Sequence, residues 1–77
     1  MKVLAVIVTY NPNLLNLNEL LYNLNKQNVE TLIIDNKSSN KISDRNTIFL
    51  KENKGIAFAQ NLGIKYAQEN NFKYIIF

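Results

Sequence analysis

The chain has 77 residues and a formal net charge of +3, and it contains neither cysteine nor histidine. A domain this short buries only about 60% of its unfolded surface, and the missing cysteines exclude disulfides and zinc–thiolate sites as compensation. Without cysteine and histidine, the thiol and imidazole nucleophile–base pairs of hydrolases are excluded as well. The eight lysines and one arginine are dispersed along the chain. A nucleic-acid-binding domain usually clusters its basic residues, so we expect no nucleic-acid partner.

The first elements follow from two kinds of apolar pattern. Residues 2–8 form a β-branched-rich apolar run, which predicts a strand buried on both faces of a parallel sheet. Residues 11–13 (Asn-Pro-Asn) end it, because proline has no amide to donate and asparagine favours turns. Four leucines at helical spacing then predict a helix: Leu17, Leu20, Leu21 and Leu24. We expect Asn16 to cap this helix, with Glu19 in the capping-box position, and the helix to end around residues 26–28.

The remaining elements continue the alternation of strands and helices. We expect a buried strand over 29–34 ending at Asp35, a loop with at most one helical turn over 36–44, and three more elements: a strand over 47–50, a helix from about 56 to 68 and a strand over 72–77. This order predicts an α/β fold with a mostly parallel sheet and right-handed crossovers. Gly63 interrupts the second helix at a cost of about 1 kcal/mol relative to alanine, and we attribute it to close packing of helix on sheet.

Polar residues mark the carboxyl ends of the predicted strands, where open α/β sheets bind ligands. Asp35, directly after a buried strand, has two interpretations. It accepts a hydrogen bond from a ligand N–H, such as the imide of uracil or thymine, or it caps the following turn. Position alone slightly favours the capping role. The segment 9–12 is equally open: it either forms one wall of a base pocket, with Tyr10 over the ring, or merely leads from strand to helix.

The segment 53–55 (Asn-Lys-Gly) precedes the second helix. A glycine at a helix N-terminus lets the backbone approach an anion such as a diphosphate. A single glycine is not a phosphate-binding fingerprint, however, and an ordinary loop glycine is the simpler interpretation. The chain also contains no Asp-x-Asp pair, the kind of hard oxygen pair that a diphosphate-bound metal requires. We therefore expect no metal to be bound by this chain alone.

Three of these segments together carry a resemblance to a known family. In order, they are residues 6–12 (VIVTYNP), 33–40 (IIDNKSSN) and 53–64 (NKGIAFAQNLGI). They resemble the start of a family-2 glycosyltransferase of the GT-A fold, and the third segment looks like the rhamnosyltransferase-like branch. The resemblance covers essentially the whole chain. It implies that residues 1–77 are the nucleotide-binding, Rossmann-like part of a GT-A domain, truncated before the family's Asp-x-Asp motif.

The resemblance also implies a site for a nucleotide-diphosphate sugar at the sheet edge. By analogy, Thr9, Tyr10 and Asn11 line the base and ribose pocket, Asp35 accepts the base N3–H with Asn36 beside it, and Asn53 and Gly55 lie beside the ribose and diphosphate. Asn61 is expected to be a structural helix residue. The family's Asp-x-Asp motif, which binds Mn²⁺ or Mg²⁺ on the diphosphate, would fall beyond Phe77. The chain would then hold no catalytic residue.

The implied whole enzyme is an inverting transferase of polysaccharide biosynthesis. Its donor would be a sugar such as rhamnose from dTDP-rhamnose, and its acceptor a glycan or lipid-linked molecule. We expect a cytoplasmic protein, with possible peripheral attachment at the inner face of the membrane, and no activity from the 77-residue chain alone. Exposed strand edges also favour self-association. The alternative is a non-catalytic flavodoxin-like or receiver-like binding domain, which would need a fifth strand and a closing helix.

Overall fold

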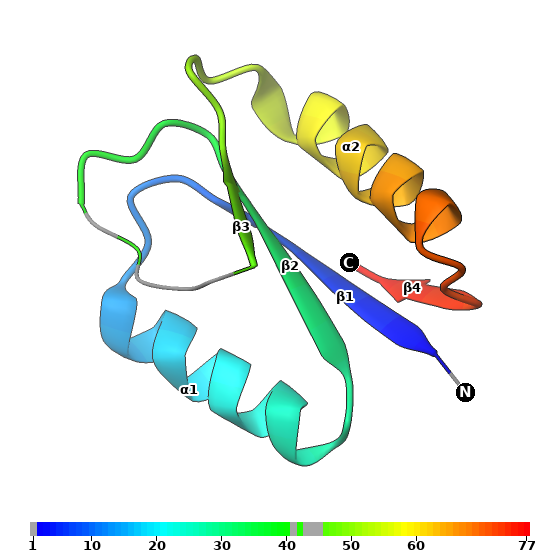
Figure 1. The fold of residues 1–77 in the computed structure, drawn as a ribbon. Coiled ribbons are helices and arrows are strands. Elements are labelled where there is room, and N and C mark those ends of the chain that lie inside the picture. Colours follow the sequence, from blue (N-terminus) through cyan, green and yellow to red (C-terminus); the bar gives the residue numbers. More distant parts are fainter. Residues whose placement is uncertain (1, 41, 43–45) are drawn as a thin grey trace.

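The computed structural model describes residues 2–40, 42 and 46–77. These residues form an α/β fold in which a parallel sheet lies between two helices (Figure 1). The elements are β1 (Val3–Thr9), α1 (Leu14–Lys26), β2 (Glu30–Asp35), β3 (Thr47–Phe49), α2 (Gly55–Glu69) and β4 (Tyr74–Ile76). The strands pair in the order β3-β2-β1-β4, and every pairing is parallel. The predicted fold class is confirmed.

The two central strands carry the core because both of their faces are covered. Alternate residues of a strand point to opposite faces. Leu4 and Val6 of β1 therefore pack with Leu32 and Ile34 of β2 on the α2 side, against Ala59 and Ala67. The intervening residues, Ile7 and Ile33, pack on the α1 side against Leu17 and Leu21. The helices lie on opposite sides of the sheet in Figure 1. This explains why β1 and β2 read as continuous apolar runs rather than alternating ones.

Helix α1 begins earlier than its leucine spacing indicates. Asn13, not Asn16, is the N-cap: its side chain accepts a hydrogen bond from the backbone amide of Asn16 at 3.1 Å. The prediction of Asn16 as the cap, with Glu19 completing a capping box, is therefore wrong. The first helical residues, Leu14 and Leu15, are exposed. Leu14 precedes Leu17 by three residues and Leu21 by seven, so it extends the apolar stripe by one turn, whereas Leu15 lies outside the stripe.

Gly63 lies where α2 meets β1. A Cβ atom added at this glycine would lie 2.6 Å from Cγ1 of Val6, well inside van der Waals contact. The predicted reason for a glycine in mid-helix, close packing of helix on sheet, is confirmed.

The outer strands are shorter than predicted. Strand β3 ends at Phe49 rather than residue 50, and β4 covers only Tyr74–Ile76 of the predicted 72–77. Phe72 instead stacks on Tyr66 of α2, with ring centroids 6.2 Å apart. The loop predicted over 36–44 has no helical turn in its described residues, 36–40 and 42. Residues 41 and 43–45 lie outside the described part of the chain.

The sheet order separates this fold from the flavodoxin-like alternative. In flavodoxin-like and receiver-like sheets, the first strand pairs with the second and third. Here β1 pairs with β2 and β4, as in the first strands of a Rossmann-like sheet. The structure therefore supports the Rossmann-like part of the prediction. No helix among residues 2–40, 42 and 46–77 has the length and apolar character needed to span a bilayer.

Candidate functional site

The topology singles out one edge of the sheet. From β1 the chain crosses over α1 to β2, whereas β4 reaches the other side of β1 through α2, on the opposite face. The strand order thus reverses at β1. Open α/β sheets bind ligands outside the carboxyl ends of the strands at such a reversal. The loops after β1, β2 and β3 meet at this end of the molecule (Figure 1).

Two adjacent strand ends are joined by a buried hydrogen bond. Thr9 and Asp35 are register partners at the ends of β1 and β2. The Thr9 hydroxyl donates to Oδ1 of Asp35 at 2.6 Å. Both residues are buried, and Asp35 is only 2% exposed. The structure therefore brings together two of the predicted site residues, but it turns their polar groups toward each other.

Ser38 provides further donors to the same carboxylate. Its hydroxyl donates to Oδ1 of Asp35 at 2.5 Å, and its backbone amide donates to Oδ2 at 2.8 Å. This is the turn-capping role that the sequence slightly favoured for Asp35. Asp35 as the acceptor of a base N3–H remains a prediction. Because the carboxylate is buried, a base reaches it only if the adjacent turn moves.

The hydrogen bonds decide the protonation state of Asp35. Burial raises the pKa of the carboxyl group, but the hydrogen bonds from the side chains of Ser38 and Thr9 and from the backbone of Ser38 and Lys37 lower it by more. The pKa of Asp35 therefore lies below its ordinary value of 3.8. At neutral pH the site holds a buried, hydrogen-bonded carboxylate, which can act only as an acceptor.

The same turn holds the loop that follows β1. The backbone amide of Asn11 donates to the Ser38 hydroxyl at 2.7 Å, and the Asn11 side chain accepts from the Ser39 amide at 2.6 Å. Asn40 adds a hydrogen bond to the carbonyl of Pro12 at 2.8 Å. Asn11 has a φ of 47°, a left-handed conformation that asparagine tolerates better than most residues. Hydrogen bonds thus join the loop after β1 to the loop after β2.

Asn36 extends these hydrogen bonds to the loop that leads from β3 into α2. Its backbone amide donates to the carbonyl of Thr9 at 2.8 Å. Its side chain donates to the carbonyl of Gly55 and accepts from the amide of Lys54, both at 3.3 Å. Asn36 is itself buried. It therefore joins the end of β2 to both the end of β1 and the start of α2.

Asn53 and Gly55 define the start of α2. The Asn53 side chain accepts from the amide of Gly55 at 2.9 Å. Gly55 has a φ of 84°, and a Cβ placed on it would meet no atom within 4 Å. The glycine is thus required by its backbone conformation rather than by crowding. Whether it also admits a diphosphate remains a prediction. The Nζ atom of Lys54 lies over the Phe58 ring, 4.9 Å from the ring centroid.

Tyr10, another predicted site residue, faces solvent, with 59% of its surface exposed. It borders a hollow of about 350 Å³ between the end of β1 and the first turns of α1. Thr9, Pro12, Asn16 and Leu20 also contribute to the lining. An exposed aromatic ring beside a partly apolar hollow offers a flat surface on which a base can stack.

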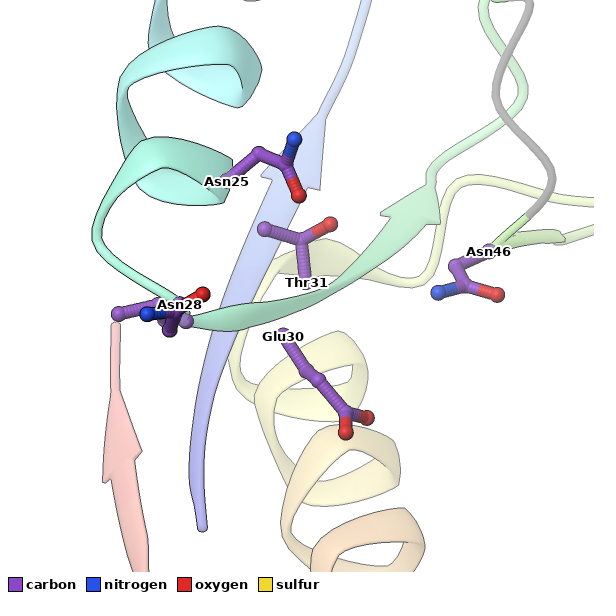
Figure 2. A pocket seen from close by; sticks show the side chains of 6 residues that line it. Asn25, Asn28, Glu30, Thr31 and Asn46 are labelled. Carbon is purple, nitrogen blue, oxygen red and sulfur yellow. The ribbon is translucent and has the colours of Figure 1, made fainter. Parts of the chain in front are cut away.

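A second hollow, of about 380 Å³, lies at the opposite end of the sheet (Figure 2). It is lined by Asn25, Asn28, Val29, Glu30, Thr31 and Asn46, around the amino end of β2. In Figure 2 the side chains of Glu30 and Thr31 point to opposite sides of the strand. These two side chains therefore do not converge on one point. Its position also lies away from the carboxyl edge at which open sheets bind ligands.

Residues 2–40, 42 and 46–77 contain no group of three or more acidic, histidine or cysteine side chains that could hold a metal ion. The resemblance places the Mn²⁺ or Mg²⁺ of the full enzyme on an Asp-x-Asp motif beyond Phe77, and this stays a prediction. Asp35 supplies one carboxylate, and its oxygens accept from Thr9 and Ser38.

Sequence reasoning did not single out Ser38 and Asn40. Both were part of a polar loop in which any residue offers hydroxyl or amide groups. For Ser38, the spacing Asp-x-x-Ser at 35–38 was the available signal, because it allows a side chain to cap the backbone three residues later. The bond from Asn11 to Ser38 has no local signal, since it links residues 27 positions apart.

Comparison with known proteins gives one informative similarity. The chain is 43% identical to the dTDP-rhamnosyl transferase RfbF of Shigella flexneri over 65 residues. The match covers 75% of this chain and 22% of the relative, so the chain spans less than a quarter of that protein. No family model and no solved structure matches it. The similarity links the chain to rhamnosyltransferase-like glycosyltransferases.

Proposed function

We propose that this chain forms the nucleotide-binding first part of an inverting, family-2 glycosyltransferase of the GT-A fold. The observation that carries the proposal is the 43% identity to a dTDP-rhamnosyl transferase. The Rossmann-like strand order supports it independently, because such sheets bind nucleotides at the reversal of strand order. The proposed donor is dTDP-rhamnose, and the acceptor is a glycan or a lipid-linked molecule.

In this proposal the base occupies the hollow beside Tyr10. The exposed ring and the apolar wall from Leu20 support stacking of a pyrimidine. Asp35 lies behind Thr9 at the same strand ends. Its carboxylate would accept the N3–H of thymine after a small movement of the turn at Ser38. Asn11 would border the ribose.

The diphosphate would lie toward the start of α2. The N-terminus of a helix favours anions through its backbone amides and its dipole. Asn36 connects this helix start to the end of β2 through its contacts with Lys54 and Gly55. Asn53 and Gly55 would thus lie beside the ribose and diphosphate. Asn36 would hold the two parts of the site in a fixed relation.

The chemical step is assigned to a following segment of a longer protein. There, an Asp-x-Asp motif would bind Mn²⁺ or Mg²⁺, and a further residue would act as the general base. In this proposal the present chain binds and orients the nucleotide. The cytoplasmic location expected from the sequence belongs to this proposal and has no separate support.

The test is a titration of the isotopically labelled 77-residue chain with dTDP, followed by NMR. We expect saturable shifts at Thr9, Tyr10 and Asn11 and none at Asn25, which lines the second hollow. The matched control is dCDP, whose cytosine lacks the N3–H and should bind more weakly. The absence of any saturable shift would contradict nucleotide binding. Equal affinities for both nucleotides would contradict the role of Asp35. With dTDP-rhamnose and an acceptor, the chain alone should transfer no sugar.

A further inference from the structure

The Ser38 hydroxyl occupies a central position between the two loops of the candidate site. It accepts from the backbone amide of Asn11 at 2.7 Å and donates to Oδ1 of Asp35 at 2.5 Å. A hydroxyl can do both at once, because it has one donor and two acceptor positions. One side chain thus joins the loop after β1 to the carboxylate at the end of β2.

The neighbouring hydroxyl groups have different relations to the network. The Thr9 hydroxyl also donates to Asp35, but Thr9 belongs to β1 and is held by the sheet register. Ser39 reaches Asn11 through its backbone amide, which any residue except proline supplies. Loss of the Ser38 side chain would therefore remove the acceptor of the Asn11 amide and a donor to Asp35 together, while the bond from the Ser39 amide to Asn11 stays.

The backbone conformation increases the dependence of the loop on this contact. Asn11 and Lys37 both have left-handed φ values, 47° and 63°. Such conformations persist where surrounding contacts hold them. The Asn11 amide, which Ser38 holds, is directly linked to Tyr10. The same hydrogen bond therefore fixes the peptide group between Tyr10 and Asn11, from which the exposed Tyr10 side chain projects beside the hollow.

We infer that Ser38 is a positioning residue for nucleotide binding: its side chain holds Asn11, and with it Tyr10, in register with the carboxylate of Asp35. The inference rests on the proposed function for its consequence in binding. Its structural part, the coupling of Asn11 to Asp35 through Ser38, can be measured in the absence of any nucleotide.

The experiment compares Ser38→Ala, Ser38→Thr and Ser39→Ala in the 77-residue chain. NMR of the unliganded proteins follows the Asn11 amide and the Asp35 carboxyl carbon, and calorimetry measures the affinity for dTDP. We expect both signals to move in Ser38→Ala and dTDP to bind about tenfold more weakly, since a hydrogen bond to a charged group is lost. Ser38→Thr keeps the hydroxyl and should restore both signals and the affinity. Ser39→Ala keeps its backbone amide and should match the wild-type chain.

The outcomes separate this inference from the proposed function. If dTDP does not bind the wild-type chain but both signals move in Ser38→Ala alone, the coupling stands and the proposed function fails. Unchanged Asn11 and Asp35 signals in Ser38→Ala would overturn the coupling. Wild-type affinity in Ser38→Ala, or no recovery in Ser38→Thr, would overturn the positioning role. Loss of the folded state in Ser38→Ala by circular dichroism would also overturn it, in favour of a purely structural role.

Discussion

At the scale of single residues, Asp35 is the charged residue that is buried in the described part of the chain. Its carboxylate is buried at the sheet edge and accepts hydrogen bonds from Thr9 and Ser38. A buried charge is tolerated only when its hydrogen-bonding capacity is satisfied. Because these hydrogen bonds lower the pKa of Asp35, its ionisation favours the folded state at neutral pH whether or not it also contacts a ligand. Its proposed role in binding is added to this structural role.

The lowered pKa of Asp35 predicts a specific loss of stability in acid. Because the folded-state pKa lies below the ordinary value of 3.8, the stabilising contribution is complete above that value. It is lost as the pH falls from there through the folded-state pKa. Urea unfolding at a series of acidic pH values should show the free energy of unfolding decreasing across this window. In Asp35→Asn this part of the decrease should be absent. An identical acid profile for both proteins would contradict the prediction.

At the scale of secondary-structure elements, close packing of α2 on β1 depends on a missing side chain. Gly63 faces the Cγ atoms of Val6, a buried residue of the core. Helix propensity alone would favour alanine at this position by about 1 kcal/mol. The steric constraint overrides this preference, because the core of so small a domain has few ways to relax.

We expect Gly63→Ala to lower the free energy of unfolding by about 1–3 kcal/mol, the usual cost of overpacking a core. Val6→Ala in the same chain should recover part of this loss, since it removes the atoms that the new Cβ would meet. Asn61→Ala, an exposed position in the same helix, is the matched control and should leave stability unchanged or slightly raise it. Urea unfolding monitored by circular dichroism compares the wild-type chain with Gly63→Ala, the Gly63→Ala/Val6→Ala double variant and Asn61→Ala. A more stable Gly63→Ala would show that the helix can shift away from β1.

The helices and strands also show which structural features can be predicted from local sequence patterns and which cannot. Runs of β-branched residues and leucines at helical spacing predicted the order of strands and helices, because both depend on local patterns. The start of α1 was missed, because Asn13 and Asn16 are both suitable N-cap residues and the four leucines used for the prediction begin only at Leu17. The hydrogen bonds from Asn11 to Ser38 and from Thr9 to Asp35 depend on the parallel register of β1 and β2. No local pattern encodes that register, so the candidate residues were predicted but their mutual contacts were not.

At the scale of the whole molecule, the sheet has two open edges, β3 and β4. Strand β4 exposes large apolar side chains there: Tyr74 is 50% exposed and Ile76 is 48% exposed. Both lie on the α1 side of the sheet, since they pair in register with Val3 and Ala5. An exposed apolar edge strand is a template for pairing with another chain. In a longer protein, a further segment would cover the same surface.

We predict that the 77-residue chain associates with itself as its concentration rises, through the edge of β4. Sedimentation velocity over a range of concentrations should show species larger than the monomer. Ile76→Lys places a charge on the exposed face of the edge and should shift the equilibrium toward the monomer. Leu15→Lys changes an exposed leucine far from that edge and is the matched control. Equal association of both variants would assign the interaction to another surface, and a monomer at every concentration would contradict the prediction.

The pairing of β1 with β4 also has a consequence for the order of events in folding. Val3 pairs with Tyr74, and the Lys2 side chain donates to the carbonyl of Asn70, 68 positions away. During synthesis, β1 emerges before β4, so one of its two edges has no partner until β4 has left the ribosome. Contacts so distant in sequence slow folding, and an unpaired central strand is prone to aggregate meanwhile. The nascent chain is therefore most vulnerable to misassembly in the period after β1 has been synthesised and before β4 is available to pair with it.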